Sequence, residues 1–430
     1  MATQQTERWI EQLNHPDKDQ RLEALKALQP NADQHKAETN SAYVNNHIHT
    51  TFSFSPYSPT KAVWQAYQAG LNTSGIMDHD TIAGAREFIE AGKILGMATT
   101  IGVECRADFS TTPMGDRRLN NPDQEAVAYL ALHGIPHTQI DTVQDFFAPY
   151  IEERNVRNAA MVERINKLLG PHGIHLDFEA DVVPLSQYHA GGSITERHIS
   201  FALAHKLMAA FGKGEKLTQF LQDDLQLSIG DKILGLLLDP DNELYDYDLL
   251  GAIKSSLVEH FYIPADAECP TVQQVLALSQ EVGSIACYAY LGDVGDSVTG
   301  DKKAQKFEDD FLDELLVMLK DLGFNAITYM PARNTLEQLL RLKKLCAEQD
   351  LFEISGEDIN SPRQSFICEA LTRPEFQNLI DSTWALIGHE LAATDNLDDA
   401  MFSPKTAAAY PDLAERIQRY KQIGLERAGS

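Results

Sequence analysis

Two histidines, His47 and His49, are separated by one residue in the stretch NNHIHT. If this stretch is a strand, both side chains lie on the same face, because side chains alternate between faces with a period of two. Two imidazoles on one face could hold one metal ion. The next residues, TFSFSPYSP, offer no carboxylate. The stretch is therefore compatible with a working metal centre and also with a reduced one.

Three further predicted strand ends carry metal-binding groups: His79 in MDHD, Glu104 in GVEC and Asp358 in SGEDIN. Imidazole and carboxylate suit zinc, manganese or iron, and carboxylates can bridge two ions. If the strands close into a barrel, their carboxyl ends converge. An ion held there would polarise a phosphoryl oxygen and activate water, which is what phosphoester hydrolysis requires.

The composition limits the possible partners. The chain has 430 residues, with 36 Lys and Arg against 63 Asp and Glu and a formal net charge of -27. Such a surface repels phosphate polymers and attracts divalent cations, so we expect no long nucleic acid as a partner. The five cysteines show no CxxC pair, the N-terminal residues have no signal-peptide pattern and no apolar run reaches membrane-spanning length. We therefore expect a soluble cytoplasmic protein that does not contact a membrane.

The order of predicted elements indicates an α/β barrel with a helical insertion. Apolar residues at helical spacing, broken near Pro16, predict a helical hairpin at the N-terminus. Strand and helix patterns then alternate, which predicts parallel pairing, and they resume after a helix-rich middle. The predicted parts are a helical prefix 1–40, a first barrel part 41–139, a helical lid subdomain 140–275, and a second barrel part with C-terminal helices 276–430.

The motifs and their order resemble the polymerase and histidinol phosphatase (PHP) family. HIHT, IMDHDT and IGVEC are similar to the family pattern HxHT, xxDHDT and GVE. ITERHISFALA is similar to the GRPHIA-type helix of the branch that acts on nucleoside 3′,5′-bisphosphates and short RNA ends, and GFNAITYMP and SGEDIN to its GxxGIEVYHP and GSDFH segments. The resemblance covers about residues 43–365. It implies a distorted (β/α)7 TIM-like barrel that binds up to three metal ions.

Carried over residue by residue, the resemblance implies a first metal held by four ligands. These ligands are His47, His49, Glu104 and Asp358. His79 matches the histidine of a further metal.

Four departures from the family pattern reduce the implied metal set. Phe54 stands where the branch has Asp, and Asn360 stands where it has the last histidine. Cys287 or Tyr288, in IACYAYLG, replaces the histidine of the family's AHP strand end. His133 is the candidate for the histidine expected after GVE, although a core histidine is an equal alternative there. We expect one or two divalent ions, Mn, Zn or Fe, with the ion that includes His79 absent or weakly bound.

The remaining polar residues near these motifs have two interpretations each. His79 is either a ligand or a proton-transfer residue. Asp78 and Asp80 are expected to orient it or to cap the helix predicted from Thr81. Arg106, Arg117 and Arg118 could reach the mouth of the site, but we expect them to lie on a solvated loop.

Two arginines could bind a substrate phosphate. Arg197 and the candidate catalytic residue His198 begin a predicted helix, where backbone amides and a guanidinium suit a phosphate. Capping by Thr195 with a solvated arginine is the alternative. Arg333, between a predicted strand and a helix, has the same chemistry.

Three functions remain open at this level. The leading hypothesis is a metal-dependent phosphoesterase acting on a small phosphorylated metabolite or nucleotide. The second is a catalytically reduced barrel that binds metal or a phosphorylated ligand as a sensor or scaffold. The third is hydrolysis of a non-phosphate bond with one metal. Substrate, metal and oligomeric state are open, and an oligomer is possible.

Overall fold

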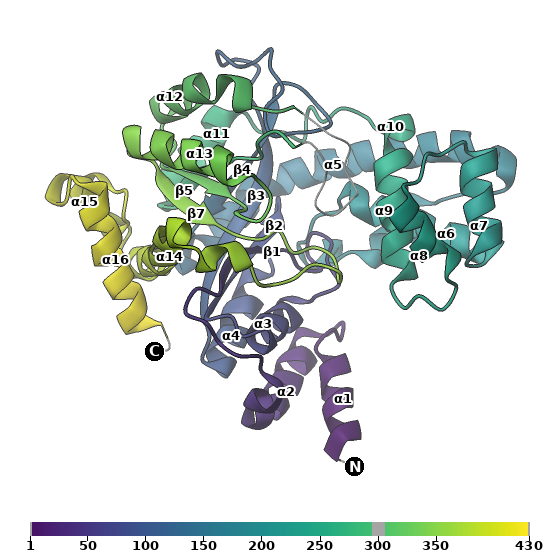
Figure 1. Cartoon of the computed structure of the whole chain (residues 1–430), viewed down its shortest axis with the longest axis horizontal. Helices are drawn as coiled ribbons and strands as arrows, with labels where there is room; N and C mark the ends of the chain where they lie inside the picture. The colour runs from purple at the N-terminus through teal and green to yellow at the C-terminus, as the bar shows by residue number, and fades with distance from the viewer. Residues whose placement is uncertain (1, 295–305, 429–430) are drawn as a thin grey trace.

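The computed structural model describes residues 2–294 and 306–428 and shows an α/β fold built on one seven-stranded sheet (Figure 1). The strands are neighbours in the order in which they occur along the chain. The predicted α/β class is therefore confirmed. The strands are β1 Val44–Ile48, β2 Thr73–His79, β3 Ala98–Asp108, β4 Val127–His133, β5 Ile285–Ala289, β6 Ala326–Tyr329 and β7 Phe352–Ser355.

One strand departs from the predicted parallel pairing. β4 runs antiparallel to both β3 and β5, whereas the other neighbouring strands pair in parallel. A loop, 109–126, connects β3 to β4, and a loop suffices because antiparallel neighbours need no crossover helix. The first residues of β4 therefore lie at the same end of the sheet as the carboxyl ends of the other strands.

The outer strands of the sheet meet just beyond β7. The amide of His49 donates to the carbonyl oxygen of Ile359 (2.9 Å), and the amide of Ile359 donates to the carbonyl oxygen of His47 (3.1 Å). A Cβ on Gly356 would lie 2.6 Å from the Cβ of His47, so this close approach requires glycine. The sheet is curled, and a parallel bridge between Ile48 and Ile359 joins its two edges.

Several helices begin at capping residues. Ser58 caps α3 by accepting from the amide of Lys61, and Pro59 occupies the first helical position. Thr271 and Thr335 each form a capping box at the start of α11 and α13. The helices are α1 Ala2–Gln12, α2 Lys18–Leu28, α3 Pro59–Gln68, α4 Ala85–Leu95, α5 Ile140–Leu169, α6 Glu196–Phe211, α7 Glu215–Gln219, α8 Asp231–Leu238, α9 Tyr245–Ser256, α10 Val258–Phe261, α11 Val272–Val282, α12 Leu312–Leu322, α13 Leu336–Glu348, α14 Gln377–Asp395, α15 Pro404–Ala409 and α16 Leu413–Arg427.

Helix α14 closes one end of the curled sheet. Glu390 of α14 accepts hydrogen bonds from the hydroxyl of Thr100 (2.6 Å) and the amide of Ile101 (2.8 Å), at the start of β3. His389 of α14 bonds the carbonyl oxygen of Gly134, just after β4 (3.1 Å). An apolar cluster fills the interior next to this helix. The polar strand ends therefore lie at the opposite end of the sheet.

The chain between β4 and β5 is helical, as predicted for this region. Helices α6 to α10 lie together on one side of the molecule, and the long helix α5 links them to the sheet (Figure 1). They share an apolar cluster of their own, drawn from residues 161–261. The domain boundaries given above stay a prediction. Among the described residues, no helix is long and apolar enough to cross a membrane.

The predicted N-terminal helices, α1 and α2, are present, and a buried ion pair ties them to the sheet's helices. Arg21 of α2 donates from Nε to Glu87 Oε1 of α4 (2.8 Å) and from Nη1 to the carbonyl oxygens of His15 and Pro16. Glu87 also accepts from the amide and hydroxyl of Thr60. Both charged side chains are buried. One arginine therefore joins the N-terminal turn to α3 and α4.

Replacing Arg21 by Met is expected to destabilise the protein by about 3–5 kcal/mol, because it leaves Glu87 buried without its cation. Urea unfolding followed by tryptophan fluorescence measures the change, and limited proteolysis should show faster cleavage within the first 35 residues. Lys26→Met, on the exposed face of the same helix, is the matched control. Equal stability of the Arg21→Met protein and the control would contradict the expectation.

Candidate metal centre

His47 and His49 point to the same side of β1, as the strand spacing predicts. Their Nε2 atoms lie 3.2 Å apart, and both side chains are buried. The bridge from Ile359 to Ile48 holds the backbone between them. The Oγ of Ser53 lies 3.2 Å from Nδ1 of His49. The two Nε2 atoms are thereby aimed at one point.

Glu104 and Asp358 meet this histidine pair from distant parts of the chain. Oε2 of Glu104, on β3, lies 3.6 Å from Nε2 of His47 and 3.7 Å from Nε2 of His49. Oδ1 of Asp358 lies 3.2 Å from Nε2 of His49. The structure thus brings the four predicted ligands of the first metal together.

The donor atoms have the spacing of a coordination sphere. His47, His49 and Glu104 each offer one ligand atom, and these atoms all lie within 4.8 Å of one another. Atoms bound at about 2.1 Å to one ion are separated by about 3–4 Å in tetrahedral or octahedral sites. Two imidazoles with carboxylates form a donor set typical of zinc, manganese or iron. The residues present therefore fit a divalent ion.

His79 lies beside this group at the end of β2. Its Nδ1 is 3.1 Å from Oε2 of Glu104, and its ring stacks on that of His49 with centroids 4.6 Å apart. Asp78 accepts hydrogen bonds from Thr50 and Ser53, so it orients the loop after β1. The predicted cap role is wrong for both aspartates, because α4 begins at Ala85 and its N-cap is Gly84.

Electrostatics keeps the two carboxylates ionised and His79 neutral, whereas Glu104 and Asp358 raise the pKa of His47 against the effect of burial. Burial opposes the charge on Glu104, but His79, His47 and His49 hold its pKa at about 2. Asp358 is likewise held well below the usual carboxyl pKa, against burial, mainly by its contact with His49. Burial lowers the pKa of His79 to about 3. At neutral pH the carboxylates are ionised and His79 is a neutral imidazole.

His133 and Cys287, the candidates for a second ion, lie deeper in the sheet. His133 is two residues further along β4 than Ala131, which pairs with Glu104. Burial lowers its pKa to about 3, and its Nε2 makes no hydrogen bond to any described residue. Cys287 belongs to the inner apolar cluster, where burial raises its thiol pKa well above the usual value. Its neighbour Tyr288 belongs to the outer cluster and so faces away from this interior.

Phe54 and Asn360, two of the departures from the ligand pattern of the PHP family that the sequence resembles, have other contacts. Phe54 adopts a left-handed φ of 90°, and its ring meets His198 edge-on with centroids 5.0 Å apart. The amide of Asn360 donates to Oδ1 of Asp358 (2.7 Å). The side-chain amide of Asn360 therefore holds the carboxylate of Asp358, a predicted ligand, in place.

The predicted phosphate-binding residues begin helix α6 and follow β6. The positive charge of Arg197 contributes to the lowered pKa of Asp358, and its guanidinium lies 5.6 Å from the ring centroid of Phe54. Nδ1 of His198 accepts from the amide of Thr195 (3.0 Å), so this histidine caps the helix. Nε of Arg333 donates to the carbonyl oxygen of Leu291 (3.1 Å), which links the segments after β5 and β6. The catalytic role of His198 and both phosphate-binding roles stay predictions.

A buried ionic network lies next to the centre, and the sequence did not indicate it. Arg106 was expected on a solvated loop, but it is on β3, two residues after Glu104, and it is buried. It pairs with Glu196 and Glu268. The network consists of Arg106, Arg154, Arg157, Asp80, Glu196 and Glu268. One signal for this network was available in the sequence: the three-residue spacing of Arg154 and Arg157 places both on one helix face.

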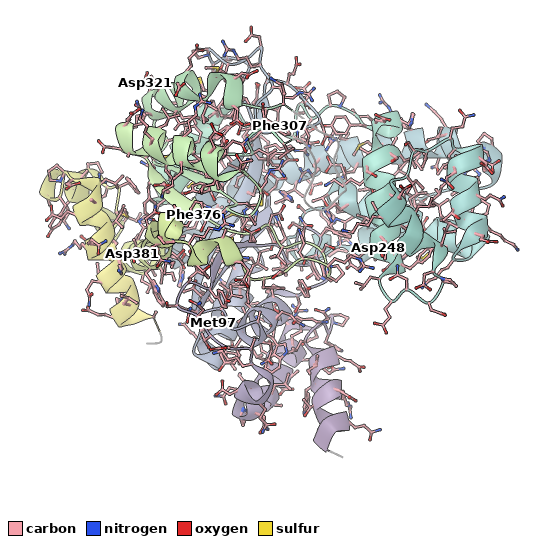
Figure 2. The ribbon with its side chains drawn as sticks, viewed as in Figure 1. Met97, Asp248, Phe307, Asp321, Phe376 and Asp381 are labelled. Atoms are coloured by element: carbon pink, nitrogen blue, oxygen red, sulfur yellow. The ribbon has the colours of Figure 1, made fainter. Side chains whose placement is uncertain are left out.

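A second ion pair joins the inserted helices to the segment that carries Asp358. Arg363 donates from Nε and Nη2 to the two carboxylate oxygens of Asp248 on α9, at 2.6 Å each. Asp248 lies on the inserted helices in Figure 2. Asn242 also donates to this carboxylate (2.7 Å). Bidentate pairing fixes orientation as well as distance, so the insertion is anchored close to a predicted ligand.

No family model matches the chain. A curated 5′-3′ exoribonuclease of Haemophilus influenzae is 45% identical over 63 residues, which are 15% of this chain and 23% of the exoribonuclease. The match thus spans less than a quarter of that relative.

Two solved structures resemble most of the chain. A candidate metal-dependent phosphoesterase from Bifidobacterium adolescentis matches with a TM-score of 0.51 and 21% identity, over 78% of this chain and 94% of that one. An amidohydrolase from Chromobacterium violaceum, with bound sulfate and no metal, matches with a TM-score of 0.50 and 15% identity, over 79% and 96%. This chain shares their fold. At these identities the likeness extends to the fold alone.

Proposed function

We propose that this protein is a metal-dependent phosphoesterase of the PHP type that hydrolyses a small phosphorylated metabolite or nucleotide. The observation that carries the proposal is the convergence of His47, His49 and Glu104, whose donor atoms lie within 4.8 Å of one another. Asp358 and His79 contact the same group. The fold shared with a candidate phosphoesterase supports the proposal.

One or two divalent ions, manganese, zinc or iron, would supply Lewis-acid activation of water and neutralise charge on the phosphoryl group. His47, His49, Glu104 and Asp358 would hold the first ion. His79 is the proton-transfer residue in this proposal, because its Nδ1 lies 3.1 Å from Oε2 of Glu104 and Nε2 is the ring nitrogen left for exchange with water.

The substrate phosphate would meet the positive end of α6. Arg197 begins this helix, and its charge already acts on Asp358. A guanidinium beside helix amides suits a phosphate group. The net charge of -27 argues against long nucleic acid as substrate.

A reduced, non-catalytic barrel is the second candidate. Phe54 places an aromatic ring where the PHP branch has a carboxylate, and the amide of Asn360 is bonded to Asp358. A barrel with one ion and no turnover would act as a sensor or scaffold for a phosphorylated ligand.

Metal reconstitution and a substrate panel distinguish the two. The chelated protein is reloaded with Mn²⁺, Zn²⁺ or Fe²⁺, its metal content is measured, and phosphate release is followed from phosphomonoesters, nucleoside 3′,5′-bisphosphates and short RNA ends. We expect one or two ions per chain and phosphate release from at least one small substrate. Metal binding without turnover across the panel would favour the second candidate, and no metal binding would contradict the metal-dependent phosphoesterase.

A further inference from the structure

Tyr129 is a tyrosine of the sheet interior at the open end of the fold. It pairs with Arg106 across β3 and β4, two residues beyond the pair of Glu104 with Ala131. Residues two apart on a strand share a face, and Ala131 belongs to the inner cluster. The side chain of Tyr129 therefore points to the interior of the curled sheet as well. Because β4 is antiparallel to β3, Tyr129 lies further than Glu104 toward the end that α14 does not close.

The side chain of Tyr129 reaches the candidate centre without using its hydroxyl. Its ring centroid lies 6.0 Å from that of His79, and the residue is half-buried. The hydroxyl forms no hydrogen bond to any described residue. Several other tyrosine hydroxyls of this chain bond carboxylates, namely those of Tyr67, Tyr188, Tyr290 and Tyr329. The hydroxyl of Tyr129 thus has its hydrogen-bonding capacity available at the mouth of the site.

A buried asparagine from the loop after β3 positions Tyr129. Asn120 accepts from the amide of Tyr129 (2.7 Å) and donates from Nδ2 to its carbonyl oxygen (2.8 Å). The same Nδ2 donates to the carbonyl oxygen of Ala289 at the end of β5 (2.6 Å). These bonds continue the pairing of β4 and β5, which ends at Leu130 and Tyr288. The backbone that carries Tyr129 is therefore held before any ligand arrives.

The neighbouring cation does not compete for this role. Arg106, which pairs with Tyr129 across the strands, directs its guanidinium to Glu196 and Glu268. Burial raises the pKa of Tyr129, so the phenol stays protonated and can donate at neutral pH. A phenol can donate a hydrogen bond to a phosphoryl oxygen. Because it is neutral, it adds no charge next to the buried ionic network.

We infer that Tyr129 contacts the substrate, by donating a hydrogen bond from its hydroxyl to a phosphoryl oxygen held above Glu104 and His79. The inference rests on the proposed phosphoesterase function. In this inference a neutral side chain of β4 contacts the phosphate, in addition to the predicted contacts of Arg197 and Arg333.

Tyr129→Phe tests the inference because it removes the hydroxyl and keeps the ring. We expect kcat/KM to fall roughly 10²-fold, as for the loss of one oriented donor. Binding of inorganic phosphate to the metal-loaded protein, measured by calorimetry, should weaken at least about tenfold. Metal content and the thermal midpoint should stay at wild-type values. Tyr43→Phe, a partly buried tyrosine just before β1 at the opposite end of the sheet, is the matched control and should change nothing.

The outcomes separate this inference from the proposed function. Wild-type turnover and phosphate affinity in Tyr129→Phe would overturn the inference and leave the phosphoesterase function standing. If the wild-type protein hydrolyses nothing, the function fails, and phosphate binding still decides the role of Tyr129. Absence of phosphate binding to the loaded wild-type protein overturns the inference. A visible charge-transfer band with Fe³⁺ that disappears in Tyr129→Phe would also overturn it, because Tyr129 would then be a metal ligand.

Discussion

Glu104→Gln should lower kcat/KM roughly 10³-fold and reduce the metal content well below one ion per chain. Oε2 of Glu104 lies within 3.1–3.7 Å of ring nitrogens of His47, His49 and His79, so it is the central anion of the group. A neutral amide keeps the shape and loses the charge. A bound metal contributes several kcal/mol of transition-state stabilisation, and each 1.36 kcal/mol corresponds to about a tenfold change in rate.

Metal analysis and steady-state kinetics on one preparation measure both effects. Glu90→Gln is the matched control, because Glu90 is an exposed residue of α4 with the same change of charge. A Glu104→Gln protein that retained its full metal content and its activity would show that the ion is held elsewhere. The proposed centre would then be wrong.

Glu268→Gln should destabilise the protein by about 3–5 kcal/mol, because it leaves a cation of the network unbalanced. Glu268 pairs with Arg106, Arg154 and Arg157, which also contact Glu196 and Asp80. Three buried guanidiniums would then face two carboxylates. Urea unfolding measures the free energy, with Asp266→Asn, an exposed neighbour, as control. A stability equal to that of the control would contradict the expected role of the network.

The same network predicts a dependence of stability on pH. Burial disfavours ionisation of Glu268, but the three arginines hold its pKa below the ordinary value of 4.5. A carboxyl whose pKa is lowered by folding stabilises the folded state above its unfolded pKa and loses that contribution as the pH falls through the folded value. The difference in unfolding free energy between wild type and Glu268→Gln should therefore shrink below about pH 4.5. A difference that grew with acid would have the wrong sign.

Local patterns were enough to predict several features. The period-two spacing of His47 and His49 predicted a shared direction, and the helical hairpin predicted at the N-terminus is present as α1 and α2. These features follow from rules that act over a few residues. The same holds for the α/β class, which depends on the alternation of short patterns along the chain.

Pairing between distant segments was harder to predict. β4 lies in an apolar run whose direction depends on its neighbours in the sheet, so its antiparallel pairing was missed. The position of Arg106 was missed for a related reason. A charged residue is ordinarily exposed, and only carboxylates from two other elements make its burial possible.

By itself, the sequence determined the chemical types at the strand ends: imidazoles and carboxylates suited to a divalent ion, with Phe54 and Asn360 where the PHP family that it resembles has ligands. Only the tertiary structure decided which of them meet. It placed Glu104 and Asp358 beside the histidine pair, put His133 deeper in the sheet, and turned Tyr129 toward His79. The physical reason is that a few ångströms of separation decide metal binding and hydrogen bonding, and strand register and sheet curvature set those distances between residues far apart in the chain.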